Sequence, residues 1–210
     1  MKKALIFDLD NTIYPVSAIA PYLFNELFEL LDRHPEILDE ATLAAAKDEL
    51  QRRHYSLVAN KYNFGAKLTE AGLNLLKDLE YRQPMQPFDA YHQLKAIPLK
   101  KFLVTTGFPN LQWSKVKELG IEADFDEIHI VDPEQSTQTK KDVFSALLLK
   151  YGYKPEDVLV IGDDPESEIK AAAELGIDTF LFDPEERYPA ALVSCRSKHL
   201  EDVVDFLKLD

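Results

Sequence analysis

The sequence is poor in cysteine, in basic side chains and in long apolar runs. Its one cysteine, Cys195, excludes an internal disulfide framework. We interpret this cysteine as an inert structural residue rather than a reactive thiolate. No stretch approaches the roughly 20 apolar residues that cross a bilayer. The apolar run at the N-terminus stops at Asp8, too short for a secretory signal. We therefore expect a soluble, cytoplasmic protein.

The shortage of basic residues narrows the possible partners. The 210 residues include 24 Lys and Arg against 37 Asp and Glu, which gives a formal net charge of −13. Because binding to nucleic acid and to anionic membranes depends on Lys and Arg, we expect neither partner. The hydrophobic share of 46% excludes a disordered or fibrous chain. The length suffices for one domain, or for one domain with an insertion.

Several common functional motifs are also missing. The histidines lack the spacing of a zinc motif such as HExxH, and we interpret them as ordinary surface or core residues. Neither a Gly-x-Gly-x-x-Gly segment nor a Walker A segment is present. Nucleotide binding by those two routes is therefore unsupported.

Short apolar runs, each ending in polar turn residues, are typical of strands buried on both faces of a parallel sheet. They lie at residues 5–7, 102–104, 127–131, 158–161 and 179–182. Helical patterns alternate with them, at residues 110–119, 140–151, 165–175 and 199–207. Alternating strands and helices predict an α/β fold with a doubly wound parallel sheet.

The stretch from residue 16 to residue 95 differs from the rest. Leucines recur in it at helical spacing, and no strand-like run interrupts it. We therefore expect an inserted, all-α cap domain over residues 16–95. Residues 1–15 and 96–210 would together form the α/β core domain.

Ligands of open α/β sheets bind at the carboxyl ends of the strands, and polar residues gather there in this sequence. Two acids follow the first strand, two threonines the second and two acids the fourth. Two lysines open the helix before the fourth strand. In order, these residues are Asp8, Asp10, Thr105, Thr106, Asp163, Asp164, Lys140 and Lys141.

Three acids close together are costly unless a cation neutralises them, and oxygen ligands suit Mg²⁺. A metal, a lysine and a hydroxyl form a cradle for a phosphoryl group. One carboxylate could serve as nucleophile and another as general acid/base. Simpler readings remain open: Asp10 as a helix cap, Thr106 as a solvated turn residue and Lys141 as a solvated helix residue.

The segment Asp8-Leu9-Asp10-Asn11-Thr12 after an apolar strand resembles the first signature of the haloacid dehalogenase superfamily. Thr105 at the end of a strand resembles the second signature, and Lys140 at the start of a helix the third. Residues 162–168 resemble the fourth. Four signatures in the family's order are highly specific, and the helical insertion matches the family's C1-type cap.

The resemblance implies a role for each matching residue. Asp8 would be the nucleophile and a metal ligand, and Asp10 the general acid/base, with its main-chain carbonyl also on the metal. Asp163 would be the third protein ligand of Mg²⁺. Thr105 and Lys140 would hold the phosphoryl oxygens.

Three positions depart from the pattern. Thr106, a further candidate for phosphate binding, stands where the family often has asparagine. No proline follows the candidate lysine. We therefore prefer Lys140 as the lysine of the site, but the sequence does not exclude Lys141. Glu168 replaces the usual aspartate. We expect Glu168 and Asp164 to contact the metal ligands and hold them in position without binding the metal themselves.

The resemblance implies a Mg²⁺-dependent phosphatase that hydrolyses a small phosphomonoester, such as a nucleotide or a sugar phosphate, through an aspartyl phosphate. Asp10 favours ester hydrolysis, because dehalogenases lack an acid there. The first motif looks closest to pyrimidine 5′-nucleotidases.

Two alternatives remain: a phosphomutase of the same superfamily and a non-catalytic phosphoacceptor. The cap residues Arg52, Arg53, Lys61 and Tyr62 could meet the substrate, but we expect them on a solvated face. The sequence leaves the physiological substrate and the oligomeric state open.

Overall fold

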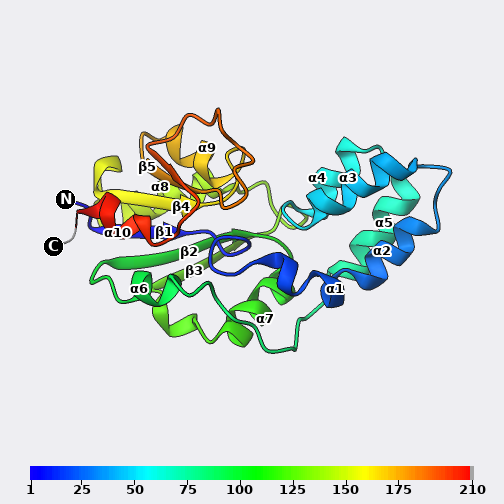
Figure 1. Ribbon diagram of the computed structural model, residues 1–210, viewed down its shortest axis with the longest axis horizontal. Coiled ribbons are helices and arrows are strands. Elements are labelled where there is room, and N and C mark those ends of the chain that lie inside the picture. Colours follow the sequence, from blue (N-terminus) through cyan, green and yellow to red (C-terminus); the bar gives the residue numbers. More distant parts are fainter. Residues whose placement is uncertain (209–210) are drawn as a thin grey trace.

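The computed structural model describes residues 1–208, and within them six parallel strands form one sheet in the order β3-β2-β1-β4-β5-β6 (Figure 1). The order reverses direction at β1, as in a doubly wound fold. This result confirms the predicted fold class. The strands are β1 (Ala4–Phe7), β2 (Lys100–Thr106), β3 (Glu127–Val131), β4 (Val158–Gly162), β5 (Asp178–Phe182) and β6 (Cys195–Ser197).

Alternate residues of the central strand β1 enter two different hydrophobic clusters, because successive side chains point to opposite faces of a sheet. Ile6 packs with the cluster that includes Phe144 of α8 (Lys140–Tyr151) and Ala172 of α9 (Glu168–Ala173). Leu5 packs with the cluster that includes Val116 of α7 (Pro109–Leu119) and Val203 of α10 (Asp202–Leu207). The sheet is therefore buried on both faces.

Helix ends follow the sequence signals where local chemistry agrees. Helix α8 begins after Thr139, which forms a capping box with Asp142, and it ends at Gly152 with φ 65°. The predicted helix over 165–175 starts late, at Glu168. Residues 165–167 instead form a turn in which the Asp164 side chain accepts a hydrogen bond from the Glu166 amide and the Asp164 carbonyl accepts one from the Ser167 amide. That side chain competes with the first helical turn.

In the region predicted as the cap, residues 16–95, all helical segments except α6 (Tyr91–Lys95) lie between residue 16 and residue 76. They are η1 (Val16–Ala18), α1 (Ala20–Leu23), α2 (Asn25–Asp32), α3 (Glu40–Leu50), α4 (Tyr55–Lys61) and α5 (Gly65–Leu76). Figure 1 shows α2 to α5 as a lobe beyond the carboxyl ends of the strands. Residues 77–90 form neither helix nor strand, so the helical block is shorter than expected. The domain boundaries stay a prediction.

Three further short helices complete the described elements. They are α6 (Tyr91–Lys95), η2 (Glu122–Asp124) and η3 (Pro155–Asp157). In α6, the ring of Tyr91 meets Phe7 of β1 edge-on, with ring centroids 6.4 Å apart. Segment 91–95 therefore packs against the sheet.

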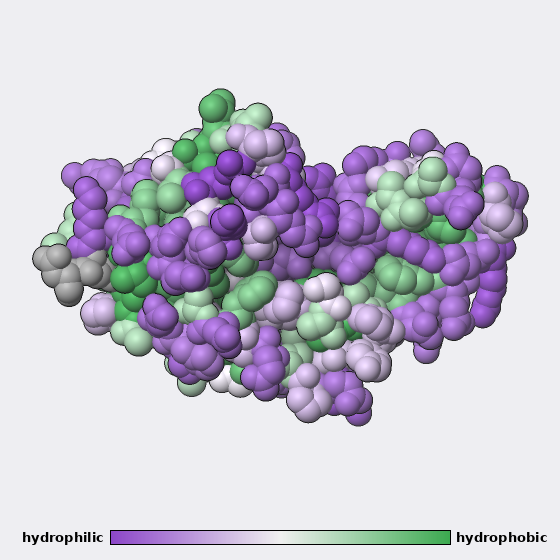
Figure 2. Space-filling model, in the orientation of Figure 1, coloured by the Kyte–Doolittle hydropathy of each residue, from purple (hydrophilic) through white to green (hydrophobic). Residues whose placement is uncertain are grey.

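The hydrophobic core extends from the sheet into the lobe. One cluster of buried side chains contains Leu5 and Leu103 of the sheet together with Leu27, Val58 and Leu68 of the lobe. Figure 2 shows hydrophilic residues over most of the viewed face of both parts. None of the helices within residues 1–208 is long and apolar enough to cross a membrane.

Candidate functional site

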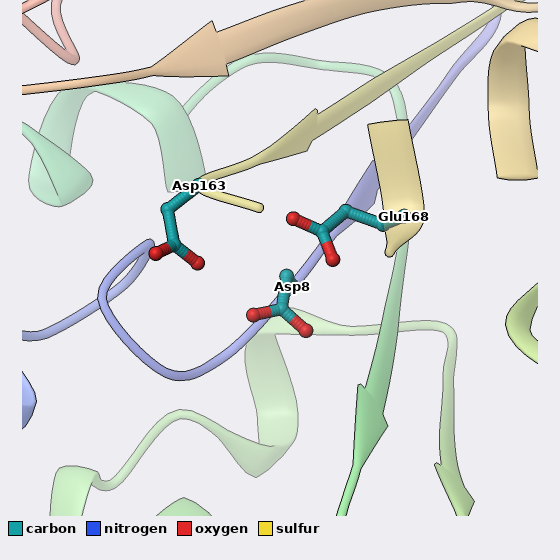
Figure 3. Close-up of side chains that lie close together, drawn as sticks. All are labelled: Asp8, Asp163 and Glu168. Carbon is teal, nitrogen blue, oxygen red and sulfur yellow. The ribbon is translucent and has the colours of Figure 1, made fainter. Parts of the chain in front are cut away.

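The site begins where β1 and β4 end side by side. These neighbouring strands are paired in register up to Phe7 and Ile161. Asp8 follows β1 directly, and Asp163 follows β4. Parallel pairing therefore brings two carboxylates that are far apart in the sequence to one edge of the sheet. Glu168, the first residue of α9, completes the group. Figure 3 shows the three carboxylates converging, and one oxygen of each lies within 4.8 Å of the others.

Lys140 lies among these acids. Its Nζ is 2.5 Å from Asp8 Oδ1 and 2.8 Å from Glu168 Oε2, and the side chain is 7% exposed. A cation at the first position of a helix is opposed by the helix dipole, so the two carboxylates must offset that cost. Lys141 instead pairs with Glu174 on the surface, at 2.8 Å. Of the two candidate lysines, Lys140 is the one that the fold places at the acids.

Glu168 reaches the acids because Gly162 leaves room for its side chain. A Cβ on Gly162 would lie 2.2 Å from Glu168 Oε1, closer than any real contact. The same oxygen accepts a hydrogen bond from the Asp164 amide at 2.8 Å. Both carboxylate oxygens of Glu168 thus have partners within the protein, which suits a residue that supports the site.

The three buried acids repel one another. Burial raises the pKa of Asp8 to about 7, although the ammonium of Lys140 opposes this shift. Burial, followed by the charge of Glu168, also raises the pKa of Asp163 well above its usual value, against the opposing effect of Arg52. A bound cation would relieve this repulsion. The donors are all oxygens, and this donor set fits Mg²⁺.

Asp10 points to a second group of side chains. Its Oδ1 accepts hydrogen bonds from the hydroxyl of Tyr14 and from Lys115 Nζ, the latter at 2.8 Å. Its Oδ2 accepts from Gln112 Nε2 at 2.9 Å. Burial works to raise the pKa of Asp10, but Lys115 and these hydrogen bonds outweigh it and lower the pKa. Asp10 is therefore a carboxylate in this arrangement.

Gln112 connects Asp10 with the second strand end. Its Nε2 donates to Thr105 Oγ1 at 2.7 Å as well as to Asp10. Gly107 allows this arrangement, because a Cβ there would lie 2.9 Å from the Gln112 side chain. Thr105 is buried, whereas Thr106 is half-buried. The base of the site is thus a connected network rather than a set of separate residues.

All eight predicted site residues line one cavity of about 230 Å³ between the sheet and the helical lobe. They are Asp8, Asp10, Thr105, Thr106, Lys140, Asp163, Asp164 and Glu168. The fold therefore brings together residues that the sequence separates by up to 160 positions. Their individual roles stay predictions.

The expectation of a solvated face is wrong for Arg52 and Arg53. Arg52 Nη2 lies 2.8 Å from Asp163 Oδ2. Arg53 holds both oxygens of Asp164, through Nε at 3.1 Å and Nη2 at 3.2 Å. Lys61 pairs instead with Glu49 on the lobe. The turn between α3 and α4 therefore contacts the edge of the sheet that carries the acids.

The sequence argument missed Gln112 and Lys115, although one signal was present. Lys115 occupies the apolar stripe of its helix, between Leu111 and Leu119. A lysine at such a position must be buried, and its side chain is only 4% exposed. A buried lysine needs a counter-ion, and Asp10 supplies it.

A parallel sheet with acids at the carboxyl ends of its strands, covered by a helical insertion, defines an α/β enzyme of the capped hydrolase class. The sequence model of the haloacid dehalogenase-like hydrolases matches residues 2–176, and the chain belongs to this family. The family resemblance is thereby confirmed. The nucleotidase-like detail of the first motif stays a prediction.

The chain resembles curated proteins over most of its length. It is 26% identical to the glyceraldehyde 3-phosphate phosphatase of Methanopyrus kandleri, over 85% of this chain and 83% of that protein. It is 28% identical to the protein of the same name from Pyrococcus furiosus, over 86% and 80%. The solved structure of the HAD-hydrolase YfnB from Bacillus subtilis, bound to magnesium, has a TM-score of 0.69, with 21% identity over 99% of both chains. This last likeness shows the fold.

Proposed function

We propose that this protein is a Mg²⁺-dependent phosphatase that hydrolyses a small phosphomonoester through an aspartyl phosphate. One observation supports this function above the others. Asp8 belongs to a buried acidic group that contacts Lys140, and it lines the same cavity as the carboxylate of Asp10. Nucleophile, proton carrier and charge-neutralising groups are thus available together. The phosphatase names of the relatives point to the same reaction, on a three-carbon phosphate.

Asp8, Asp163 and the main-chain carbonyl of Asp10 would hold the metal ion. When bound, Mg²⁺ would neutralise negative charge on the transferring phosphoryl group. Lys140 would bind a phosphoryl oxygen, and its contact with Glu168 fixes the ammonium in position. Thr105 and Thr106 would donate hydrogen bonds to the remaining oxygens.

Asp8 and Asp10 would divide the reaction between them. Asp10 is a carboxylate in the structure and would have to take up a proton before the first turnover. A carboxylate oxygen of Asp8 then attacks phosphorus, the P–O ester bond breaks, and the leaving alkoxide takes that proton from Asp10. Asp10, now a carboxylate, accepts a proton from a water molecule. That water attacks the aspartyl phosphate and releases inorganic phosphate and free Asp8. Asp10 thereby regains its proton for the next turnover.

The lobe formed by α2 to α5 would exclude water while the aspartyl phosphate exists. A cytoplasmic location, expected from the sequence, stays a prediction. A phosphomutase would give an isomeric phosphate without free phosphate, so product analysis separates the two reactions. A stable phospho-aspartate without turnover would instead indicate a phosphoacceptor.

Phosphate release from nucleotides, sugar phosphates and phosphoglycolate, measured with Mg²⁺ and with EDTA, tests this function. We expect Asp8→Asn to abolish turnover and EDTA to suppress it. The neighbouring lysines form a matched pair, because Lys140→Met removes the buried ammonium and Lys141→Met only a surface one. Only the first should lose activity. Undiminished release by Asp8→Asn, or hydrolysis that resists EDTA, would contradict the assignment.

A further inference from the structure

His54 is a polar residue of the lobe that lines the same cavity as Asp8 and Asp10. It directly follows Arg53 in the turn between α3 and α4. Its side chain lies against Phe108, with ring centroids 4.7 Å apart, and the residue is 8% exposed. Phe108 directly follows the Thr105-Thr106-Gly107 segment. The imidazole is therefore held between the lobe and the predicted phosphate-binding segment.

One nitrogen of this buried ring has no partner. Among residues 1–208, His54 Nε2 makes no hydrogen bond. The other nitrogen, Nδ1, lies 2.9 Å from Ser56 Oγ and accepts a hydrogen bond from the Ser56 amide at 3.4 Å, where it caps α4. Because a backbone amide can only donate, and a serine hydroxyl can donate as well, we take Nδ1 as the acceptor of both contacts and assign the proton of the neutral ring to Nε2. A buried N–H without an acceptor is costly, so it needs an explanation.

Other polar groups that the lobe presents to the cavity already have partners. Arg52 is paired with Asp163, and Arg53 with Asp164. Gln51 donates to the Lys47 carbonyl at 3.4 Å. The remaining lining from the lobe is largely apolar, and it includes Phe24, Leu27, Leu50 and Leu76. Ligand cavities are commonly built this way, with apolar walls and a few polar groups that orient the ligand.

We propose that His54 binds the leaving group of the substrate, its Nε2–H donating a hydrogen bond to a hydroxyl or carbonyl oxygen. This proposal rests on the phosphatase function above and adds the substrate class. The preferred substrate is the phosphomonoester of a short carbon chain that bears such an oxygen. A cavity of about 230 Å³ is smaller than those that hold drug-sized ligands, which favours a short leaving group.

Glycerol 3-phosphate and propyl phosphate test this proposal, because they share a three-carbon chain and differ in the two hydroxyl groups. We expect wild-type protein to prefer glycerol 3-phosphate in kcat/KM. In His54→Asn, an amide oxygen can still cap α4, but the Nε2 donor is lost. The loss in this variant should be about tenfold greater for glycerol 3-phosphate than for propyl phosphate. His54→Gln, whose amide group reaches further along the side chain, should restore part of the preference.

Each other outcome overturns the proposal. Equal losses on both compounds would give His54 a purely structural role. An unchanged preference in the variant would show that the hydroxyl groups are bound elsewhere. If wild-type protein had nearly the same kcat/KM for glycerol 3-phosphate and propyl phosphate, the proposal would be overturned. This measurement needs no variant, so it holds even if one of the variants fails to fold. Phosphate release in any of these cases would leave the phosphatase function standing. Wild-type protein that hydrolyses no phosphomonoester would overturn both.

Discussion

Asp10 is the most constrained residue of the candidate site. Tyr14, Gln112 and Lys115 all donate hydrogen bonds to its carboxylate. Lys115 is the charged one of the three donors, and it comes from the helix that follows the second strand. In the proposed mechanism Asp10 gives and takes a proton at one place in the cavity, and such a residue benefits from being held at both oxygens. Lys115 is therefore expected to position Asp10.

Replacement of Lys115 by Met keeps the carbon stem and removes the charge. For an alkyl phosphate, we expect kcat to fall on the order of 100-fold, because alkoxide leaving groups need the proton from Asp10. For para-nitrophenyl phosphate the fall should be smaller, since nitrophenolate leaves without protonation. Lys115→Arg, which restores the charge, should recover part of the rate. Steady-state kinetics on both substrates checks this, and equal losses would argue against a role through Asp10.

His54 should also make stability depend on pH. Burial lowers its pKa below the ordinary value of 6.5, although Glu134 and Asp132 oppose the shift. The unfolded ring gains a proton as the pH falls through 6.5, whereas the folded ring gains it only at a lower pH. The stabilising contribution is therefore complete above that pH and is lost below it.

Urea unfolding at about pH 7.5 and about pH 5.5 measures this contribution. Wild-type protein should lose about 1 kcal/mol more than His54→Asn between the two pH values, because the asparagine does not titrate. Comparison with the variant cancels the other groups that titrate in this range. Equal losses in the two proteins would show that the imidazole is not protected from protonation.

At the scale of elements, the turn between α3 and α4 connects the lobe to the sheet. Arg53 in this turn binds Asp164 with two nitrogens, and Asp164 in turn holds the residues before α9. The side chain of Asp164 is only 8% exposed. Without Arg53, the negative charge of Asp164 would be buried with no cation beside it, and an unpaired buried charge lowers the free energy of unfolding.

Arg53→Met should therefore lower the free energy of unfolding by about 1–3 kcal/mol. Arg33→Met is a suitable control, because the ion pair of Arg33 with Glu29 lies on the lobe and the two side chains are 72% and 54% exposed. An exposed pair of this kind contributes about 0.5 kcal/mol or less. Chemical denaturation of both variants checks the difference. Similar losses would mean that the contact between turn and sheet adds no stability.

The same elements show what a sequence can predict. Strands buried on both faces can be recognised in the sequence as apolar runs. Because the carboxyl ends of parallel strands lie at one edge of the sheet, Asp8 and Asp163 could be predicted to lie together. Strand β6 could not be predicted, because Cys195–Ser197 joins the sheet through backbone pairing with β5 and has no apolar pattern. The position of Arg52 depends on how the lobe sits on the sheet, which local patterns do not encode.

At the scale of the whole molecule, the net charge of −13 takes on a specific meaning. Part of it is concentrated in Asp8, Asp163 and Glu168, which are buried within one group. A phosphate ester is itself an anion, so this group should repel the substrate until a cation is present. Lys140 and Arg52 offset this charge only in part, because these two cations contact a group of three acids. If the proposed function holds, this buried acidic group predicts a requirement for a divalent metal.

Metal binding should accordingly stabilise the folded chain even without substrate. A ligand that binds only the folded state adds about 2.7 kcal/mol at a concentration 100 times its Kd. We expect MgCl₂ to raise the melting temperature, and NaCl of equal ionic strength to raise it much less, because screening acts weakly on buried charges. Asp163→Asn should abolish the response to Mg²⁺. Glu70→Gln removes the same charge from an exposed position of α5 and should keep it. If both variants respond like wild type, the metal does not bind at the carboxyl ends of β1 and β4.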